Sequence, residues 1–317
     1  MATAPAKLAT RPLDATARDK PRVALGIAVA GLTANVLIVL TSGLVRLTGS
    51  GLGCPTWPRC VEDSFVTTPE MGVHGVVEFG NRVLGILVGL ITIAMLIAVV
   101  RNRRRSGTTI VLAAGGLVGV LAQGLIGGLS VRRELAPEIV TVHFLVSMII
   151  VAAITVLVDV LRRPRARRQL PAHRAVGWLV AALPVVLTVV LVLGTLITGS
   201  GPHAGDEGAR RFDLNPATLS WLHADAIVFF LGLQIAALIA LRVTKAPQAL
   251  QRASLMLLGA SLIQGLIGYL QYVLELPVAL VAAHILGAAL VTLATTHLVT
   301  TAWRSTAPAS PAARHPS

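Results

Sequence analysis

The chain has 317 residues, of which 55% are hydrophobic and only 13% are charged, and its mean hydropathy is +0.78. Soluble domains carry about 25% charged residues, so this composition excludes an ordinary soluble enzyme and predicts a polytopic membrane protein. A formal net charge of +13 would suit nucleic-acid binding in a soluble chain. Here the cations lie at the ends of apolar segments, which favours contact with a lipid bilayer and its anionic headgroups and argues against a nucleic-acid partner.

Eight apolar stretches are each longer than the roughly 20 residues that a helix needs to cross a bilayer. In chain order they cover residues 23–46, 74–100, 108–130, 139–161, 175–198, 219–241, 254–274 and 278–301. The predicted fold class is therefore an all-α polytopic membrane protein with eight transmembrane helices. The outer loops would be residues 47–73, 131–138, 199–218 and 275–277.

Lysine and arginine are concentrated before the first helix and in every second connection. They are Lys7, Arg11, Arg18, Lys20, Arg22, Arg101, Arg103, Arg104, Arg105, Arg162, Arg163, Arg165, Arg167, Arg168, Arg174, Arg242, Lys245 and Arg252. Because short cytoplasmic loops carry an excess of cations, we expect a multi-pass protein of the cell membrane with both termini in the cytoplasm. The tails, 1–22 and 303–317, are rich in Ala, Pro, Ser and Arg and are predicted to be disordered.

The first outer loop contains the only two cysteines, Cys54 and Cys60, in the sequence GLGCPTWPRC. A disulfide persists outside the cytoplasm, whereas a zinc site would need further ligands. We predict a disulfide, which is either a structural clip or a redox-active pair.

The helix at 74–100 begins with three polar residues on one face, His74, Glu78 and Asn81. A carboxylate this close to a membrane helix is costly, and we predict that Glu78 carries a proton or stabilises developing positive charge. The structural alternative is a salt bridge to Arg82 at i+4.

The chain is duplicated. QGLIGGLSVRRELAPEIVTVH, from Gln123 to His143, returns as QGLIGYLQYVLELPVALVAAH, from Gln264 to His284, at an offset of 141 residues. LTGSG at 47–51 and ITGSG at 197–201 extend the match to the first helix of each half. We predict two four-helix bundles, 23–161 and 175–302, joined by a basic cytoplasmic linker over 162–174. Halves with an even number of helices share one topology, so their pseudo-two-fold axis lies along the membrane normal.

The repeat places Asn81, His143, His223 and His284 at one level near the outer surface. A histidine inside a membrane helix is by default a functional-site hypothesis. His223 and His284 can face each other across a bundle, as the two axial ligands of a haem do. In the N-terminal half His143 is the one strong ligand, opposite Asn81, and His74 lies two turns away from Asn81 as a candidate second ligand.

The glycines of GLIGG, 124–128, and GLIGY, 265–269, favour a large flat ligand such as haem over a bis-histidine metal site. Close helix packing also favours small residues and stays open. Arg46 and Arg82 would pair with haem propionates or reach the interface. The other histidines, His173, His203 and His297, are expected to form interfacial hydrogen bonds, and Asp225 is expected to be structural.

With these motifs, the TGSGPHAGD loop at 198–206 and EFGNR at 78–82, the chain outside its tails resembles the haem A synthase family. The resemblance implies oxidation of the C8 methyl of haem O to a formyl group by successive hydroxylations, giving haem A for cytochrome oxidase. It implies haem b held by His223 and His284, haem O as substrate at His143, Glu78 as the catalytic residue, and haem O synthase as a partner. A homo-oligomer is left open.

Asn81 departs from the family pattern, Glu-x-x-His-Arg, in which a histidine stands at this position. An amide is a poor iron ligand, and His74 lies about 10 Å further along the helix axis. We therefore expect His143 to hold the substrate iron alone. Two other functions stay open: a transmembrane b-type cytochrome that carries electrons without oxidising a substrate, and, ranked third, a transporter, which would need polar groups at mid-membrane.

Overall fold

The computed structural model describes residues 21–102, 105–162 and 174–303. The predictions for the two tails and for most of the 162–174 linker, with His173, lie outside these residues. Within them the chain forms eight α-helices that are long and apolar enough to cross a membrane. The fold class predicted from the sequence is confirmed.

The helices follow one another with short connections, apart from the first and third outer loops. Their bounds are α1 Pro21–Leu47, α2 Gly72–Val100, α3 Gly107–Arg132, α4 Pro137–Arg162, α5 Arg174–Ser200, α6 Pro216–Val243, α7 Gln248–Val273 and α8 Val278–Trp303, with a short 3-10 helix, η1, at Pro69–Met71. The prediction for α7 began six residues late, because its polar first turn, with Gln251 and Arg252, lowers the local hydropathy. The side chain of Asn215 caps α6 by accepting from the backbone N–H groups of Ala217 and Thr218 at 2.9 and 3.2 Å.

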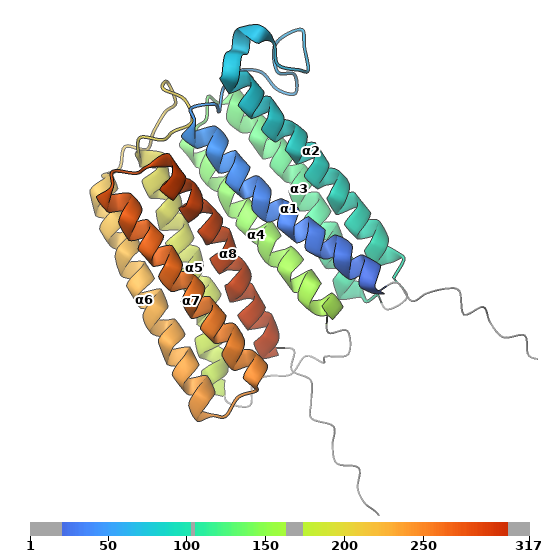
Figure 1. Cartoon of the computed structure of the whole chain (residues 1–317), viewed down its shortest axis with the longest axis vertical. Helices are drawn as coiled ribbons and strands as arrows, with labels where there is room; N and C mark the ends of the chain where they lie inside the picture. The colour runs from blue at the N-terminus through green and yellow to red at the C-terminus, as the bar shows by residue number, and fades with distance from the viewer. Residues whose placement is uncertain (1–20, 103–104, 163–173, 304–317) are drawn as a thin grey trace, which may run out of the picture.

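The eight helices form two four-helix bundles that lie side by side (Figure 1). In each bundle a helix packs against its neighbours in the chain, and the first helix packs against the fourth. Among the described residues the diagonal pairs, α2 with α4 and α6 with α8, make no contact. A residue on α6 therefore faces one on α8 only across the interior of the bundle.

Contacts between the bundles obey the predicted pseudo-two-fold relation. Helix α1 packs on α8 and its counterpart α5 packs on α4, while α4 and α8 meet each other. Exchanging the halves leaves this set of contacts unchanged. A small apolar cluster with Val36 and Val39 of α1, Val151 of α4 and Ala289 of α8 fills the interface.

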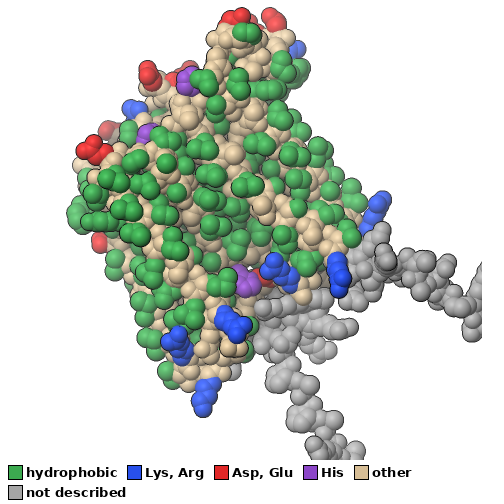
Figure 2. Space-filling view, in the orientation of Figure 1, with side chains coloured by type: hydrophobic (Ala, Val, Ile, Leu, Met, Phe, Trp, Pro, Cys, Tyr) green, Lys and Arg blue, Asp and Glu red, His purple; other side chains and the backbone are tan. Residues whose placement is uncertain are grey.

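A broad apolar band crosses the face of the molecule shown in Figure 2. Apolar side chains such as Ile86, Val111 and Val228 are at least 66% exposed, as expected for surfaces that face lipid. In Figure 2 acidic side chains gather at the end that carries the longer loops, and most of the visible basic side chains gather at the opposite end. These features are those of a multi-pass membrane protein.

Candidate functional site

The C-terminal bundle brings two histidines toward each other. His223 projects from the second turn of α6 and His284 from the second turn of α8, two diagonal helices. Both side chains are half-buried, and the two imidazoles are close enough to interact electrostatically. This arrangement is consistent with the prediction that His223 and His284 face each other.

The duplication extends to individual hydrogen bonds. The amide Nε2 of Gln264 donates to the backbone carbonyl of His284 at 2.8 Å, and Nε2 of Gln123 donates to the carbonyl of His143 at the same distance. Gln123 also donates to Ser147, a hydroxyl whose counterpart in the second half is Ala288. In both bundles a glutamine thus binds the backbone of the histidine in the same way, and the bundles differ in the other polar groups that this glutamine contacts.

The side chain of Asn81 is hydrogen-bonded to α1, a neighbouring helix of the same bundle. Its Oδ1 accepts from Thr41 Oγ1 at 2.8 Å, and its Nδ2 donates to Ser42 Oγ at 3.0 Å, both on α1. The two polar atoms of the amide are therefore used between α1 and α2. His143 lies on α4, the helix diagonal to α2, and is the one imidazole that the repeat places at this level of the N-terminal bundle.

His74 lies in the first turn of α2, where it is exposed. Its Nδ1 is 2.9 Å from the hydroxyl of Ser50 in the first outer loop. This histidine joins the loop to the helix two turns away from Asn81.

Glu78 is buried beneath the first outer loop. Its Oε2 accepts from the backbone N–H of Cys54 at 2.7 Å, and its Oε1 is 2.6 Å from the guanidinium of Arg82. The i+4 salt bridge offered above as the structural alternative is present, and Glu78 has a second partner that its position in the sequence did not reveal.

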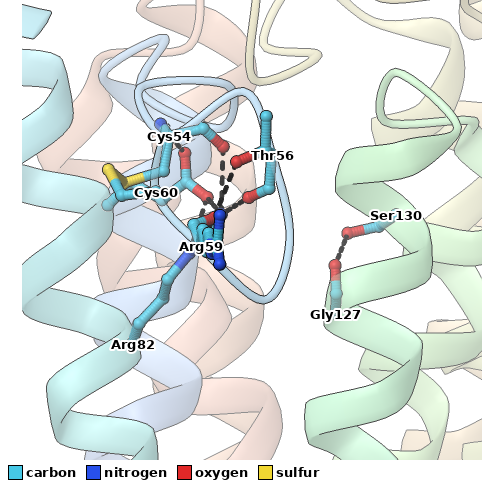
Figure 3. A network of polar contacts seen from close by, with 8 residues as sticks. Cys54, Thr56, Arg59, Cys60, Arg82, Gly127 and Ser130 are labelled. Atoms are coloured by element: carbon cyan, nitrogen blue, oxygen red, sulfur yellow. Dashed lines mark hydrogen bonds and ion pairs between the residues drawn. A yellow bond between two sulfur atoms is a disulfide. The ribbon is translucent and has the colours of Figure 1, made fainter. Parts of the chain in front are cut away.

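Arg82 is the centre of a polar network (Figure 3). Besides Glu78, its guanidinium donates to the backbone carbonyls of Cys54, Thr56 and Arg59, each at 3.0 Å. Buried carbonyls without partners are costly, so this arginine fixes the path of the loop. The predicted disulfide between Cys54 and Cys60 closes the same segment, and both cysteines are fully buried.

Trp57, in the middle of this disulfide loop, reaches from α2 to the neighbouring helix α3. Its indole packs on the backbone of Gly128 in α3, where a Cβ would collide with the ring. Arg132 lies over the indole, 5.8 Å from its centroid, and donates to the carbonyl of Trp57 at 3.1 Å. The loop therefore spans from α2 to α3 and covers the outer end of the bundle beside Gly127, which contacts His143.

The outer loops of the two halves are joined to each other. Arg46 of α1 donates to the carbonyls of His203 and Thr198 at 2.7 and 2.8 Å, and Gly51 N–H donates to the carbonyl of Gly205 at 2.8 Å. His203 in turn lies 3.2 Å from the carbonyl of Leu276, so its expected interfacial hydrogen bond is present. A cavity of about 350 Å³ remains between these loops, lined by Leu52, Pro55, Val131, Glu134, Asp206 and Gly208.

His297 has a partner that the sequence did not indicate. Its Nδ1 is 2.9 Å from both carboxylate oxygens of Asp159, which pairs α8 with α4 near the ends that follow His284 and His143 by several turns. Asp225, by contrast, is exposed on α6.

The residues of the two bundles fit a haem to different degrees. The imidazoles of His143, His223 and His284 make no hydrogen bond among the described residues, and their Nδ1 atoms are buried without a partner. Imidazoles that the protein leaves unpaired are expected where a ligand binds through the other ring nitrogen. Two such imidazoles on diagonal helices fit the axial positions of one haem in the C-terminal bundle. In the N-terminal bundle His143 fits one axial position, and Asn81 offers none because α1 binds both its polar atoms.

Fold and site together define a class: a duplicated membrane protein of two four-helix bundles, with histidines near the outer end of each. Residues 26–296 match the COX15-CtaA family, described as cytochrome oxidase assembly protein, and the chain belongs to this family.

Curated relatives carry the name Heme A synthase. The proteins of Alkalihalophilus pseudofirmus and Symbiobacterium thermophilum are 32% and 33% identical over 125 and 119 residues, which are 39% and 37% of this chain. The chain spans 41% and 38% of the length of these two relatives. The protein of Bradyrhizobium sp. is 31% identical over 206 residues, 54% of this chain and 55% of that relative.

Proposed function

We propose that this protein is a haem A synthase, which oxidises the C8 methyl of haem O to a formyl group by successive hydroxylations with water as the oxygen source. Membership of the COX15-CtaA family and the name of its relatives, Heme A synthase, support the assignment to haem A synthesis. The observation that carries it is the asymmetry of the repeat: one bundle has two facing imidazoles, and the other has a single imidazole beneath a disulfide loop.

The C-terminal bundle would hold haem b between His223 and His284. A haem held by two imidazoles supplies one-electron transfer when it is bound, by which the electrons removed from the methyl group would reach an external electron acceptor. The protein's part is to fix the two rings on diagonal helices, and the carbonyl of His284 is tied to Gln264 for this purpose.

The N-terminal bundle would receive haem O, with its iron on His143 and its apolar tail in lipid. The disulfide loop, with Trp57 packed on α3, lies over the outer end of this bundle and would limit the access of water to it. Glu78 is placed under the loop and would stabilise positive charge that develops at the methyl carbon, or accept a proton released from it. Its bond to Cys54 N–H holds the carboxylate in one position.

The distribution of charge supports an orientation with both termini in the cytoplasm and the joined outer loops on the other side of the cell membrane. Haem O would enter sideways from the bilayer, delivered by a haem O synthase as partner.

The experiment is pigment analysis of the purified full-length protein, made in cells that lack their own haem A synthase and contain haem O synthase. We expect haem B, haem O and haem A in the extract of the wild type, and loss of haem B in His223→Ala and His284→Ala. The competing function, a b-type cytochrome without substrate oxidation, predicts stably bound haem B with no haem A in cells or protein. That result would overturn the proposal.

A further inference from the structure

Each of the three histidines proposed to bind haem lies against a glycine of the preceding helix. The pairs are His143 with Gly127, His223 with Gly194 and His284 with Gly268. A Cβ added to these glycines would lie 3.4, 3.3 and 2.9 Å from Cε1 of the facing imidazole. Carbon atoms pack best at about 3.5–4.0 Å, so a Cβ at Gly268 would displace the ring, one at Gly194 would press on it, and one at Gly127 would be in van der Waals contact with it.

All three rings approach the glycine with the same edge. After Cε1, the next atom toward the glycine is Nδ1 in every pair, and Nε2 is the more distant nitrogen. Nδ1 of each ring is also buried without a hydrogen-bond partner among the described residues, so the edge of the ring that faces the glycine is its buried edge.

This arrangement suits an iron ligand. A histidine that binds a metal through one nitrogen usually donates its other N–H to a carbonyl, which fixes the tautomer and the orientation of the ring. Here the missing side chain lets the Nδ1 edge reach the helix backbone, so that Nε2 is left for the metal.

Close helix packing does not explain these glycines equally well. Gly124 and Gly265 belong to the same repeated motifs, and a Cβ at either would meet no atom within 4 Å. Within each motif, the glycine three residues later is the one that an imidazole contacts.

The position of Asn81, which is equivalent to those of the three histidines and is called the fourth corner below, has neither a histidine nor a facing glycine. The match of LTGSG to ITGSG places Leu44 at the position of Gly194, and the repeat places Asn81 at that of His223. Thr41 and Ser42, which bind the amide of Asn81, stand where the second half has the apolar Leu191 and Val192.

We infer that Gly127, Gly194 and Gly268 are positioning residues that support the haem-binding imidazoles, and that Leu44 together with Asn81 closes the fourth corner to a ligand. The inference rests on the proposed haem sites. It attributes the loss of the fourth ligand to Leu44 and Asn81 together, whereas the departure from the family motif indicates Asn81 alone.

The sharper test introduces a histidine and a glycine at the fourth corner. Full-length Asn81→His and the double variant Asn81→His/Leu44→Gly are purified with their haem, and the axial ligands are identified by electron paramagnetic resonance. We expect the single variant to keep the wild-type spectrum and the double variant to gain a second low-spin signal of a haem with two imidazoles. If Asn81→His alone gains the same signal, Leu44 does not close the corner and the inference fails for it.

The second test removes a support. Gly268→Ala and Gly194→Leu, which copies the residue of the fourth corner, are compared with Gly265→Ala and Gly232→Leu, whose added atoms start in open space. We expect the first two to lower the affinity for haemin, titrated into haem-depleted protein, by about tenfold or more, and the controls to keep it. Unchanged affinity and ligation in a folded Gly268→Ala would overturn the role of the glycine.

Folding is checked by size-exclusion elution and by thermal unfolding of the haem-depleted protein. A wild type that binds no haem would overturn the proposed function and this inference together. A wild type that binds haem, with glycine variants that bind it equally well, would overturn the inference alone.

Discussion

Glu78 accepts a hydrogen bond from the backbone N–H of Cys54 at 2.7 Å, although 24 residues separate them in the chain. The bond joins the carboxylate proposed for catalysis to the disulfide loop that covers the N-terminal bundle. Glu78 therefore has two roles that substitutions must separate: its charge, and its contacts to the loop and to Arg82.

Glu78→Gln should separate these roles, because the amide oxygen still accepts from Cys54 N–H while the negative charge is lost. We expect Glu78→Gln to keep the haem B content of the wild type, to lose haem A formation, and to lose less stability than Glu78→Ala, because it keeps the bond to Cys54 N–H although its NH2 group faces Arg82 in place of Oε1. Glu78→Ala should lose haem A and also destabilise the loop, since the N–H of Cys54 and the guanidinium of Arg82 lose a partner. Pigment analysis and thermal unfolding measure the two effects. Normal haem A formation by Glu78→Gln would remove the charge of Glu78 from the mechanism.

Gly128→Tyr should displace the disulfide loop from α3. Tyrosine is the residue that the second half carries at the equivalent position, Tyr269, and any Cβ at 128 collides with the indole of Trp57. We expect cyanide or imidazole to reach the haem of the N-terminal bundle several-fold faster, and the loop to be cut more readily by protease. Gly124→Tyr is the matched control, because position 124 has no neighbour within 4 Å. Equal access in both variants would show that Trp57 does not cover the site.

Asn81→Leu should weaken the contact between α1 and α2 without changing the number of haems bound. The substitution removes hydrogen bonds to Thr41 and Ser42, which in membrane helices contribute about 0.6 kcal/mol each on average. Thermal or denaturant unfolding in detergent should show a loss of about 1–2 kcal/mol. Loss of a haem signal in this variant would mean that Asn81 contributes to ligation after all.

Asp159→Ala should destabilise the interface between the two bundles, because His297 loses its partner at 2.9 Å, a carboxylate that is 9% exposed. We expect a loss of about 1–3 kcal/mol in unfolding free energy, as for other buried groups that lose a hydrogen-bond partner. Haem absorption should stay unchanged, since the pair lies several turns from His143 and His284 along α4 and α8. His297→Gln and the double variant complete a thermodynamic cycle, and a coupling energy near zero would show that the two residues do not interact.

Much of the fold could be predicted because its signals are local or repeated. Hydropathy located all eight helices, with the largest error at the polar first turn of α7. The duplication from Gln123 to His284 predicted the two bundles, and the outer position of Cys54 and Cys60 predicted their disulfide. The salt bridge of Glu78 with Arg82 was readable as an i+4 pair, whereas the bond to Cys54 was not, because it depends on how the loop folds back over α2.

The sequence by itself determined the membrane class, the duplication and the identity of the residues that differ between its halves. The most important of these is Asn81, which stands at the position equivalent to His223. Only the tertiary structure decided what the divergent residues contact: Asn81 with the hydroxyls of α1, Trp57 with Gly128, and each imidazole with one glycine among several. The physical reason is that lipid and bundle interior are both apolar, so hydropathy fixes the length of a membrane helix and leaves its rotation open. Rotation is fixed by packing and by the few polar partners, and these come from segments distant in the chain.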